Sequence, residues 1–217
     1  ISPDGREIAF GACASDPPHD PWLWAVFAVE VPAAIRAKGK PGKVRQVSSK
    51  EFRDTSSPRY TPDGKWIVYG MQREFDFYAD KTRLVALNRA SGAHTVLTEA
   101  WDRSASGWDF SADSRTIYIR AEDRARSTLY ALDLAAAVRA PKRALPRPLV
   151  RQNVFGAPEI AGGRAFVSIS SVLSPPECAV IDLKLKRLRR VTEFTKPAMK
   201  DIQLSEVEET HVTGAGG

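Results

Sequence analysis

The fold of this chain is decided by the stretch Thr61-Pro62-Asp63-Gly64, which Lys65 separates from Trp66-Ile67-Val68-Tyr69. Proline presets φ at the first turn position, aspartate bonds back to the backbone, and glycine accepts a positive φ. The first four residues therefore predict a tight turn. The apolar, β-branched and aromatic run that follows predicts a strand buried on both faces.

The same pattern recurs along the chain. Ser2-Pro3-Asp4-Gly5 leads into Glu7-Ile8-Ala9-Phe10, and Ser111-Ala112-Asp113-Ser114 leads into Thr116-Ile117-Tyr118-Ile119; a degenerate copy, Ala161-Gly162-Gly163-Arg164, leads into Ala165-Phe166-Val167-Ser168-Ile169. The anchors Asp4, Asp63, Asp113 and Gly163 are 59, 50 and 50 residues apart. A repeat of this length that holds four short strands is typical of the blades of a β-propeller.

Further apolar runs supply the other strands of each unit. They lie at residues 23–27 and 44–47, 83–87 and 94–97, 128–132 and 148–150, and 179–183 and 188–191. We therefore predict an all-β fold, a partial β-propeller of about four four-stranded blades built from TolB-like or WD40-like repeats. A β-sandwich with similar turns is the alternative. Single helical turns are expected inside strand connections at residues 32–37 and 134–139.

The first unit lacks its innermost strand, because the chain starts at the first turn of that unit. Propellers usually close with about four to eight blades. We therefore expect an open arc of a larger ring, with self-association through the open blade edges as a consequence. The alternative is a small closed ring, in which residues 203–212 pair beside the strand at residues 8–10.

The composition is that of a soluble globular chain, with 217 residues, 43% hydrophobic and 27% charged. No apolar run reaches the roughly 20 residues of a membrane helix, so no membrane partner is predicted. The net charge is +6. Its densest basic cluster, at residues 184–190, alternates with leucine, which favours a solvated strand face over a nucleic-acid site. Cys13 and Cys178 have apolar neighbours and are predicted to be buried free thiols.

Three stretches resemble the propeller domain of the prolyl oligopeptidase family of serine peptidases, in particular its dipeptidyl-peptidase V and acylaminoacyl-peptidase branch. They are Ser57-Pro58-Arg59-Tyr60-Thr61-Pro62-Asp63-Gly64-Lys65, Trp101-Asp102-Arg103-Ser104 and Ala121-Glu122-Asp123-Arg124-Ala125-Arg126. The tail, Lys200-Asp201-Ile202-Gln203-Leu204-Ser205-Glu206-Val207-Glu208-Glu209, resembles the segment in which these enzymes enter their α/β-hydrolase domain.

The resemblance implies a boundary, with propeller blades in residues 1–198 and a linker and first strand toward an absent hydrolase domain in residues 199–217. In that family the catalytic Ser, Asp and His belong to the hydrolase domain, and the Ser lies in a Gly-x-Ser-x-Gly elbow. No such pentapeptide occurs in this sequence, so no catalytic residue is assigned. The resemblance thus implies a non-catalytic propeller that gates peptide access to an attached hydrolase domain. A TolB-like protein-binding module is the alternative.

The residues themselves offer little other chemistry. His94 is expected on a solvent-facing strand position, and His211 on an exposed strand face beside Glu208. His19 lies in a proline-rich loop between Asp16 and Asp20, but no further ligand follows with metal spacing. No metal and no cofactor are therefore predicted.

The substrate-facing surface is predicted from the order of the strands. Loops between the second and third strands of all units leave one face, and the Pro-Asp-Gly turns leave the other. The former loops, at residues 13–22, 72–81, 122–127 and 171–177, are expected to be longer and more variable, which is where functional groups concentrate. Their charges suit the amino terminus and carbonyls of a peptide. We predict Glu74, Glu122 and Arg124 as the substrate contacts.

Overall fold

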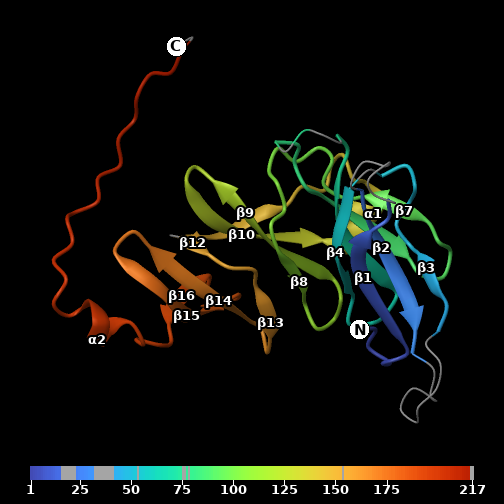
Figure 1. The fold of residues 1–217 in the computed structure, drawn as a ribbon, viewed down its shortest axis with the longest axis horizontal. Coiled ribbons are helices and arrows are strands. Elements are labelled where there is room, and N and C mark those ends of the chain that lie inside the picture. The colour runs from blue at the N-terminus through green and yellow to red at the C-terminus, as the bar shows by residue number, and fades with distance from the viewer. Residues whose placement is uncertain are drawn as a thin grey trace.

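The computed structural model describes residues 1–15, 23–31, 42–52, 54–74, 77, 79–152 and 154–215. They form four antiparallel sheets that follow one another along the chain (Figure 1). The expected helical turn at residues 32–37 and the loop that contains His19 lie outside the described residues.

The first sheet has three strands, and the second has four in the order of the sequence. The first contains β1 Glu7–Cys13, β2 Trp24–Glu30 and β3 Val44–Gln46. The second contains β4 Asp54–Tyr60, β5 Trp66–Gln72, β6 Arg83–Asn88 and β7 His94–Val96. Within the described residues the first sheet therefore has no strand on the inner side of β1, as the sequence predicts.

The third sheet also has four strands, and the fourth has five. The third contains β8 Trp108–Phe110, β9 Thr116–Asp123, β10 Arg126–Asp133 and β11 Arg147–Gln152, with the short helix α1 Leu134–Arg139 between the last two. The fourth contains β12 Val154–Phe155, β13 Glu159–Ala161, β14 Arg164–Ser171, β15 Ser174–Asp182 and β16 Arg187–Arg190, and the helix α2 Lys196–Met199 follows it. Both β12 and β13 pair with β14, so they act as one interrupted inner strand.

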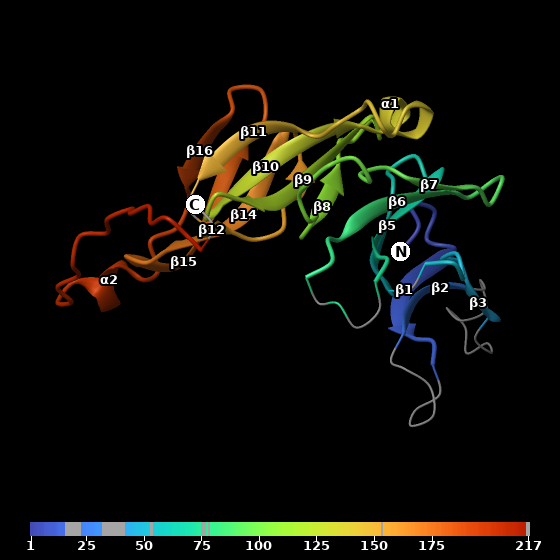
Figure 2. The same cartoon turned by 90° about the horizontal axis from the view of Figure 1, so that it is seen from above.

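The sheets are arranged as consecutive blades of an open arc, with the first and the fourth at opposite ends (Figures 1 and 2). Residues 202–214 form neither helix nor strand, so the described tail does not close the ring beside β1. The all-β propeller predicted from the repeats is therefore confirmed in its open form. Self-association through its edges stays a prediction.

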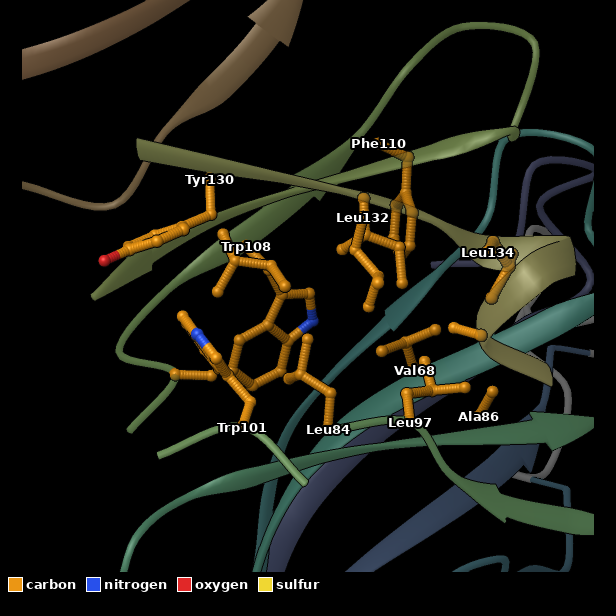
Figure 3. Close-up of a cluster of buried hydrophobic side chains, with 14 of the residues drawn as sticks. Val68, Leu84, Ala86, Leu97, Trp101, Trp108, Phe110, Tyr130, Leu132 and Leu134 are labelled. Atoms are coloured by element: carbon orange, nitrogen blue, oxygen red, sulfur yellow. The ribbon is translucent and has the colours of Figure 1, made fainter. Parts of the chain in front are cut away.

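Each pair of neighbouring blades encloses its own apolar cluster. The middle cluster contains Leu84 and Leu97 from the second blade and Trp108 and Ile119 from the third (Figure 3). Along β5, Val68 belongs to this cluster, whereas Ile67 and Tyr69 belong to the cluster shared with the first blade. Both faces of a blade are thus buried, which is why its central strands are continuously apolar.

The recurring turn carries one repeated set of hydrogen bonds. In the second blade the hydroxyl of Thr61 donates to Asp63 Oδ1 at 2.6 Å, and that oxygen accepts the backbone N–H of Lys65 at 3.1 Å. Ser2 with Asp4, and Ser111 with Asp113, repeat the hydroxyl–carboxylate bond at 2.6 Å. A hydroxyl residue two positions before the aspartate is therefore part of the repeat. The fourth copy lacks both and turns on two glycines of positive φ instead.

Candidate functional site

The blades end in two different surfaces. We call the "loop face" the side that holds the β1–β2, β5–β6, β9–β10 and β14–β15 connections together with the passages from one blade to the next. The "turn face" is the opposite side, with the Pro-Asp-Gly turns. Lys81 of the loop face donates to the carbonyls of Glu99 and Trp101 at 2.6 and 2.7 Å, which ties the β5–β6 connection to the passage between the second and third blades.

Two of the four connections expected to be long loops are tight turns. The strands β9 and β10 pair as far as Asp123 and Arg126, so only Arg124 and Ala125 form the turn. Their φ angles are 51° and 56°, as in the turns that match the twist of a hairpin. Similarly, β14 and β15 are joined through residues 172–173 alone. The expectation of loops at 122–127 and 171–177 is wrong because strand pairing continues to the end of each hairpin.

The structure places Glu74, Glu122 and Arg124 on the loop face, all with exposed side chains. Glu122 lies one residue before the end of β9 and pairs with Arg120 of the same strand. Arg124 lies in the adjoining turn, where its carbonyl accepts a hydrogen bond from Arg151 at 3.2 Å. No hydrogen bond or ion pair joins the three predicted residues to one another within the described parts of the chain. They form an exposed rim rather than a closed site.

A denser set of charges lies behind this rim in the second blade, and its members Arg83 and Glu99 have no signal in the sequence. The guanidinium of Arg83 is largely buried and contacts Asp80 at 2.8 Å and Glu99 at 3.1 Å. Glu99 also pairs with Arg73 at 2.7 Å. Burial raises the pKa of Asp80, but the hydrogen bonds from Arg83 and from the backbone N–H groups of Glu74 and Arg73 outweigh it and lower the pKa overall. The backbone of Glu74 is thereby anchored, and its carboxylate projects from a fixed position.

A second ion pair links the passage between blades to the β9–β10 hairpin. Arg103 donates to Asp123 at 2.9 Å and also pairs with Asp102 at 2.7 Å. The hydrogen bond from Arg103 holds the pKa of the Asp123 carboxyl below its usual range. The hydroxyl of Tyr130 lies 3.4 Å from the same carboxylate, and its ring packs edge-on against Trp101. The turn that carries Arg124 is therefore fastened to the hydrophobic core.

A third ionic cluster joins the inner strands of three blades. Arg59 of β4 donates to both carboxylate oxygens of Glu159 of β13, at 2.7 and 3.3 Å, and lies 3.6 Å from Asp109 of β8. Asp109 also accepts the backbone N–H of Ile160 at 2.6 Å. The pairing with Glu159 raises the pKa of Arg59. No local sequence signal marks this cluster, because its members come from three repeats about 50 residues apart.

The groups tested for catalysis do not form a catalytic arrangement. His94 is half-buried, not solvent-facing as expected, because its ring bonds the carbonyl of Val47 at 3.0 Å and packs against Phe52 and Tyr69. His211 is exposed in the tail, 4.0 Å from Glu209. Among the described residues no group of three metal-ligating side chains is found, and no helix has the length and apolarity of a membrane span. Both cysteines are free, but neither is buried as predicted, since Cys13 is half-buried and Cys178 is exposed.

Comparison with known proteins supports the resemblance to peptidase propellers that the sequence shows. A dipeptidyl-peptidase 5 of Trichophyton schoenleinii is 29% identical over 140 residues, which are 61% of this chain and 19% of that protein. No protein-family profile matches the chain. The chain thus corresponds to about a fifth of the length of the curated relatives it matches.

Solved structures agree on the fold. A puromycin hydrolase superposes with a TM-score of 0.62 over 91% of this chain and 29% of its own, at 19% identity. TolB of Acinetobacter baumannii superposes with a TM-score of 0.61 over 89% of this chain and 42% of its own, at 16% identity. The similarity to the propeller portion of prolyl oligopeptidase-family peptidases, predicted from the sequence, is confirmed by these findings together.

Proposed function

We propose that this chain, which is similar to the propeller portion of dipeptidyl-peptidase 5 proteins, is the non-catalytic propeller segment of a serine peptidase. Its parent enzyme cleaves short peptides, in the manner of dipeptidyl- or acylaminoacyl-peptidases. The segment filters peptides and completes the cavity of an attached α/β-hydrolase domain. The match to named peptidases over 19% of their length, within a chain that folds as blades alone, carries this proposal.

The loop face is the surface that we assign to the substrate. Its exposed charges are held on anchored backbone, since the N–H of Glu74 is bonded to Asp80 and the hairpin of Glu122 and Arg124 is fastened through Asp123 to Arg103. Fixed carboxylates and guanidinium groups suit the charged amino terminus and the carbonyls of a peptide. In this arrangement Glu74, Glu122 and Arg124 select peptides, and the chemistry takes place in the attached domain.

Active-site labelling tests the division of labour. The isolated chain and the whole protein, extended into the adjoining reading frame, are treated with a fluorophosphonate probe and with chromogenic dipeptidyl and acyl-aminoacyl substrates. We expect labelling and hydrolysis by the whole protein only, at a serine beyond these 217 residues. A serine labelled inside the chain would contradict the non-catalytic role. A whole protein that neither reacts nor hydrolyses would contradict the peptidase.

Kinetics of the whole protein test the loop face. Glu122→Ala combined with Arg124→Ala should change kcat/KM for short peptides and leave the melting temperature nearly constant. Arg115→Ala serves as the matched control, because Arg115 is an equally exposed arginine in a tight turn of the opposite face. Unchanged kinetics of the double variant across several peptides would remove these residues from the substrate surface.

The alternative function is a protein-binding propeller without enzymatic activity. The solved structures favour this alternative in one respect: the superposed region makes up 42% of TolB but only 29% of the puromycin hydrolase. A reading frame with no Gly-x-Ser-x-Gly elbow beyond the chain would support this alternative over the peptidase.

A further inference from the structure

The outer part of the third blade is rich in basic residues, and the proposed function assigns these residues no role. Between Leu134 and Pro158 the sequence contains five basic residues and no acidic one. This segment forms α1, the connection that follows it, β11 and β12. Helix α1 lies at the end of β10, where the chain turns back into β11 (Figure 2). Because the C-terminal end of β10 belongs to the turn face, Arg139, Arg143 and Arg147 lie on the side opposite the proposed peptide surface. Arg151, in contrast, donates to the carbonyl of Arg124 at the loop face.

These residues enclose a pocket of about 690 Å³. Three arginines line it, each four residues after the one before. Arg139 lies in the last turn of α1, Arg143 in the turn after it, and Arg147 at the start of β11. The remaining wall is mostly apolar and includes Leu132 and Leu145, while the side chain of Thr116 adds a hydroxyl.

The backbone that presents the three arginines is fixed. Asp133 accepts the N–H of Ala136 at 2.7 Å and so caps α1 at its start. After the helix, the N–H of Arg143 donates to the carbonyl of Ala140 at 2.9 Å. Arg147 is set opposite Ala131 by the pairing of β11 with β10. The pocket is therefore built on ordered structure, and its cations do not depend on a loose loop for their position.

The three guanidinium groups have no acidic partner among the described residues, unlike the arginines that anchor the loop face. Within the described residues Arg73, Arg83, Arg103 and Arg120 each pair with a carboxylate, whereas Arg139, Arg143 and Arg147 form no ion pair. The one carboxylate that lines the pocket, Asp133, is engaged in capping α1. Three mutually repelling cations around one hollow with a single carboxylate leave a strong local excess of positive charge.

We propose that this pocket binds a phosphate-bearing anion through Arg139, Arg143 and Arg147. A guanidinium presents its N–H groups in a planar fork that matches two oxygens of one phosphate, and three such forks satisfy more than one phosphate group. The apolar wall beside them contacts the organic part of the ligand. A soluble phosphate ester and a phospholipid headgroup share this chemistry. The inference does not rest on the peptidase proposal, since it concerns the opposite face.

Calorimetric titration of the 217-residue chain with inorganic tripolyphosphate tests the site. We expect one ion per chain to bind, and the triple variant R139Q/R143Q/R147Q to bind it at least about tenfold more weakly, because the loss of even one charge-assisted bond costs on the order of a factor of ten. The matched control is K184Q/K186Q/R189Q, which removes three cations from the turn end of the fourth blade and should bind as the unchanged chain does. Circular dichroism checks that both variants remain folded.

Co-sedimentation with vesicles separates the two ligand sources. Vesicles of phosphatidylcholine with phosphatidylglycerol are compared with vesicles of phosphatidylcholine alone. Retention on the anionic vesicles that persists in the presence of tripolyphosphate assigns the site to a lipid headgroup. Retention that tripolyphosphate abolishes assigns the site to a soluble phosphate. Equal weakening of binding in the triple variant and the control, or no binding to either probe, would overturn the proposal.

Discussion

The loop face of the second and third blades and the turn end of the third blade are both rich in arginine, yet they use it differently. On the loop face, Arg83 and Arg103 each bind two carboxylates. At the turn end, Arg139, Arg143 and Arg147 surround a pocket without an ion pair among the described residues. The arginines of the loop face form ion pairs that hold loops in place, whereas the arginines of the turn end remain available to bind a ligand.

The difference teaches that cation content alone does not locate a binding surface. The net charge of +6 is spread over the chain, but acids such as Glu99, Asp102 and Asp123 cluster at the loop face. None occurs from residue 134 to residue 158. Paired charges near a surface interact weakly with a distant ligand because their fields cancel, whereas unpaired ones steer it. Four measurements test whether the two sets of arginines differ in this way.

Replacing a paired arginine of the loop face should have the largest effect on stability. Arg83→Met leaves the largely buried carboxylate of Asp80 without its cation, whereas Glu99 keeps Arg73, and an uncompensated buried charge costs about 3 kcal/mol of unfolding free energy. Arg143→Met is the matched control and should change stability by less than about 0.5 kcal/mol, because Arg143 is exposed and unpaired. Urea unfolding measures both. Equal losses would show that the two arginines are held in the same way.

Acid should weaken the loop end of the fourth blade through Glu177. Glu177 of the fourth blade is buried and accepts hydrogen bonds from Thr192 and Thr195, which lower its pKa from 4.5 to about 2. Because the folded-state pKa lies below that of the unfolded chain, Glu177 adds stability above about pH 4.5 that is lost as the pH falls toward about 2. The melting temperature should therefore fall over this range, and less steeply in Glu177→Gln.

The exposed acid of Glu51 provides the control for this experiment. Glu51→Gln should follow the pH curve of the unchanged chain. If Glu177→Gln loses stability between pH 4.5 and 2 as steeply as the unchanged chain does, the hydrogen bonds of Glu177 are not the source of the acid sensitivity.

The tight turn beneath Arg124 should respond to glycine. Ala125 has a φ of 56°, a region that a side chain disfavours and glycine accepts. Ala125→Gly should therefore raise the unfolding free energy by about 0.5 to 1 kcal/mol. Ala131→Gly, within β10, should lower it by roughly the same amount because the strand gains backbone freedom in the unfolded state. Thermal melting distinguishes the two signs, and destabilisation by both would contradict the turn geometry.

The smallest effect is expected at the turn end itself. In R139Q/R143Q/R147Q the mutual repulsion of three cations is removed, so stability at low salt should rise by no more than about 0.5 kcal/mol. The gain should vanish at about 1 M salt, where charges are screened within about 3 Å. A loss of stability at low salt would show that these arginines have carboxylate partners after all.

Much of the fold follows from the sequence because its repeat is local. The turn at Asp63 needs only a hydroxyl, a carboxylate and a glycine within a few residues, and these bond to one another in the structure as well. The helical turn Leu134–Arg139 is likewise confirmed. The expected long loops at 122–127 and 171–177 failed, because the length of a hairpin depends on how far two strands remain paired.

The repeats alone predict the number of blades in these 217 residues and the turn that starts each of them. Which charged side chains form ion pairs depends on the tertiary structure. Arg59 meets Glu159 across 100 residues of sequence, and Arg83 meets Glu99 across 16. The turn and strand pattern of a repeat can be recognised within a single segment of the sequence. An ion pair, in contrast, requires two segments to approach within about 4 Å. That approach depends on how neighbouring blades pack, which no single repeat encodes.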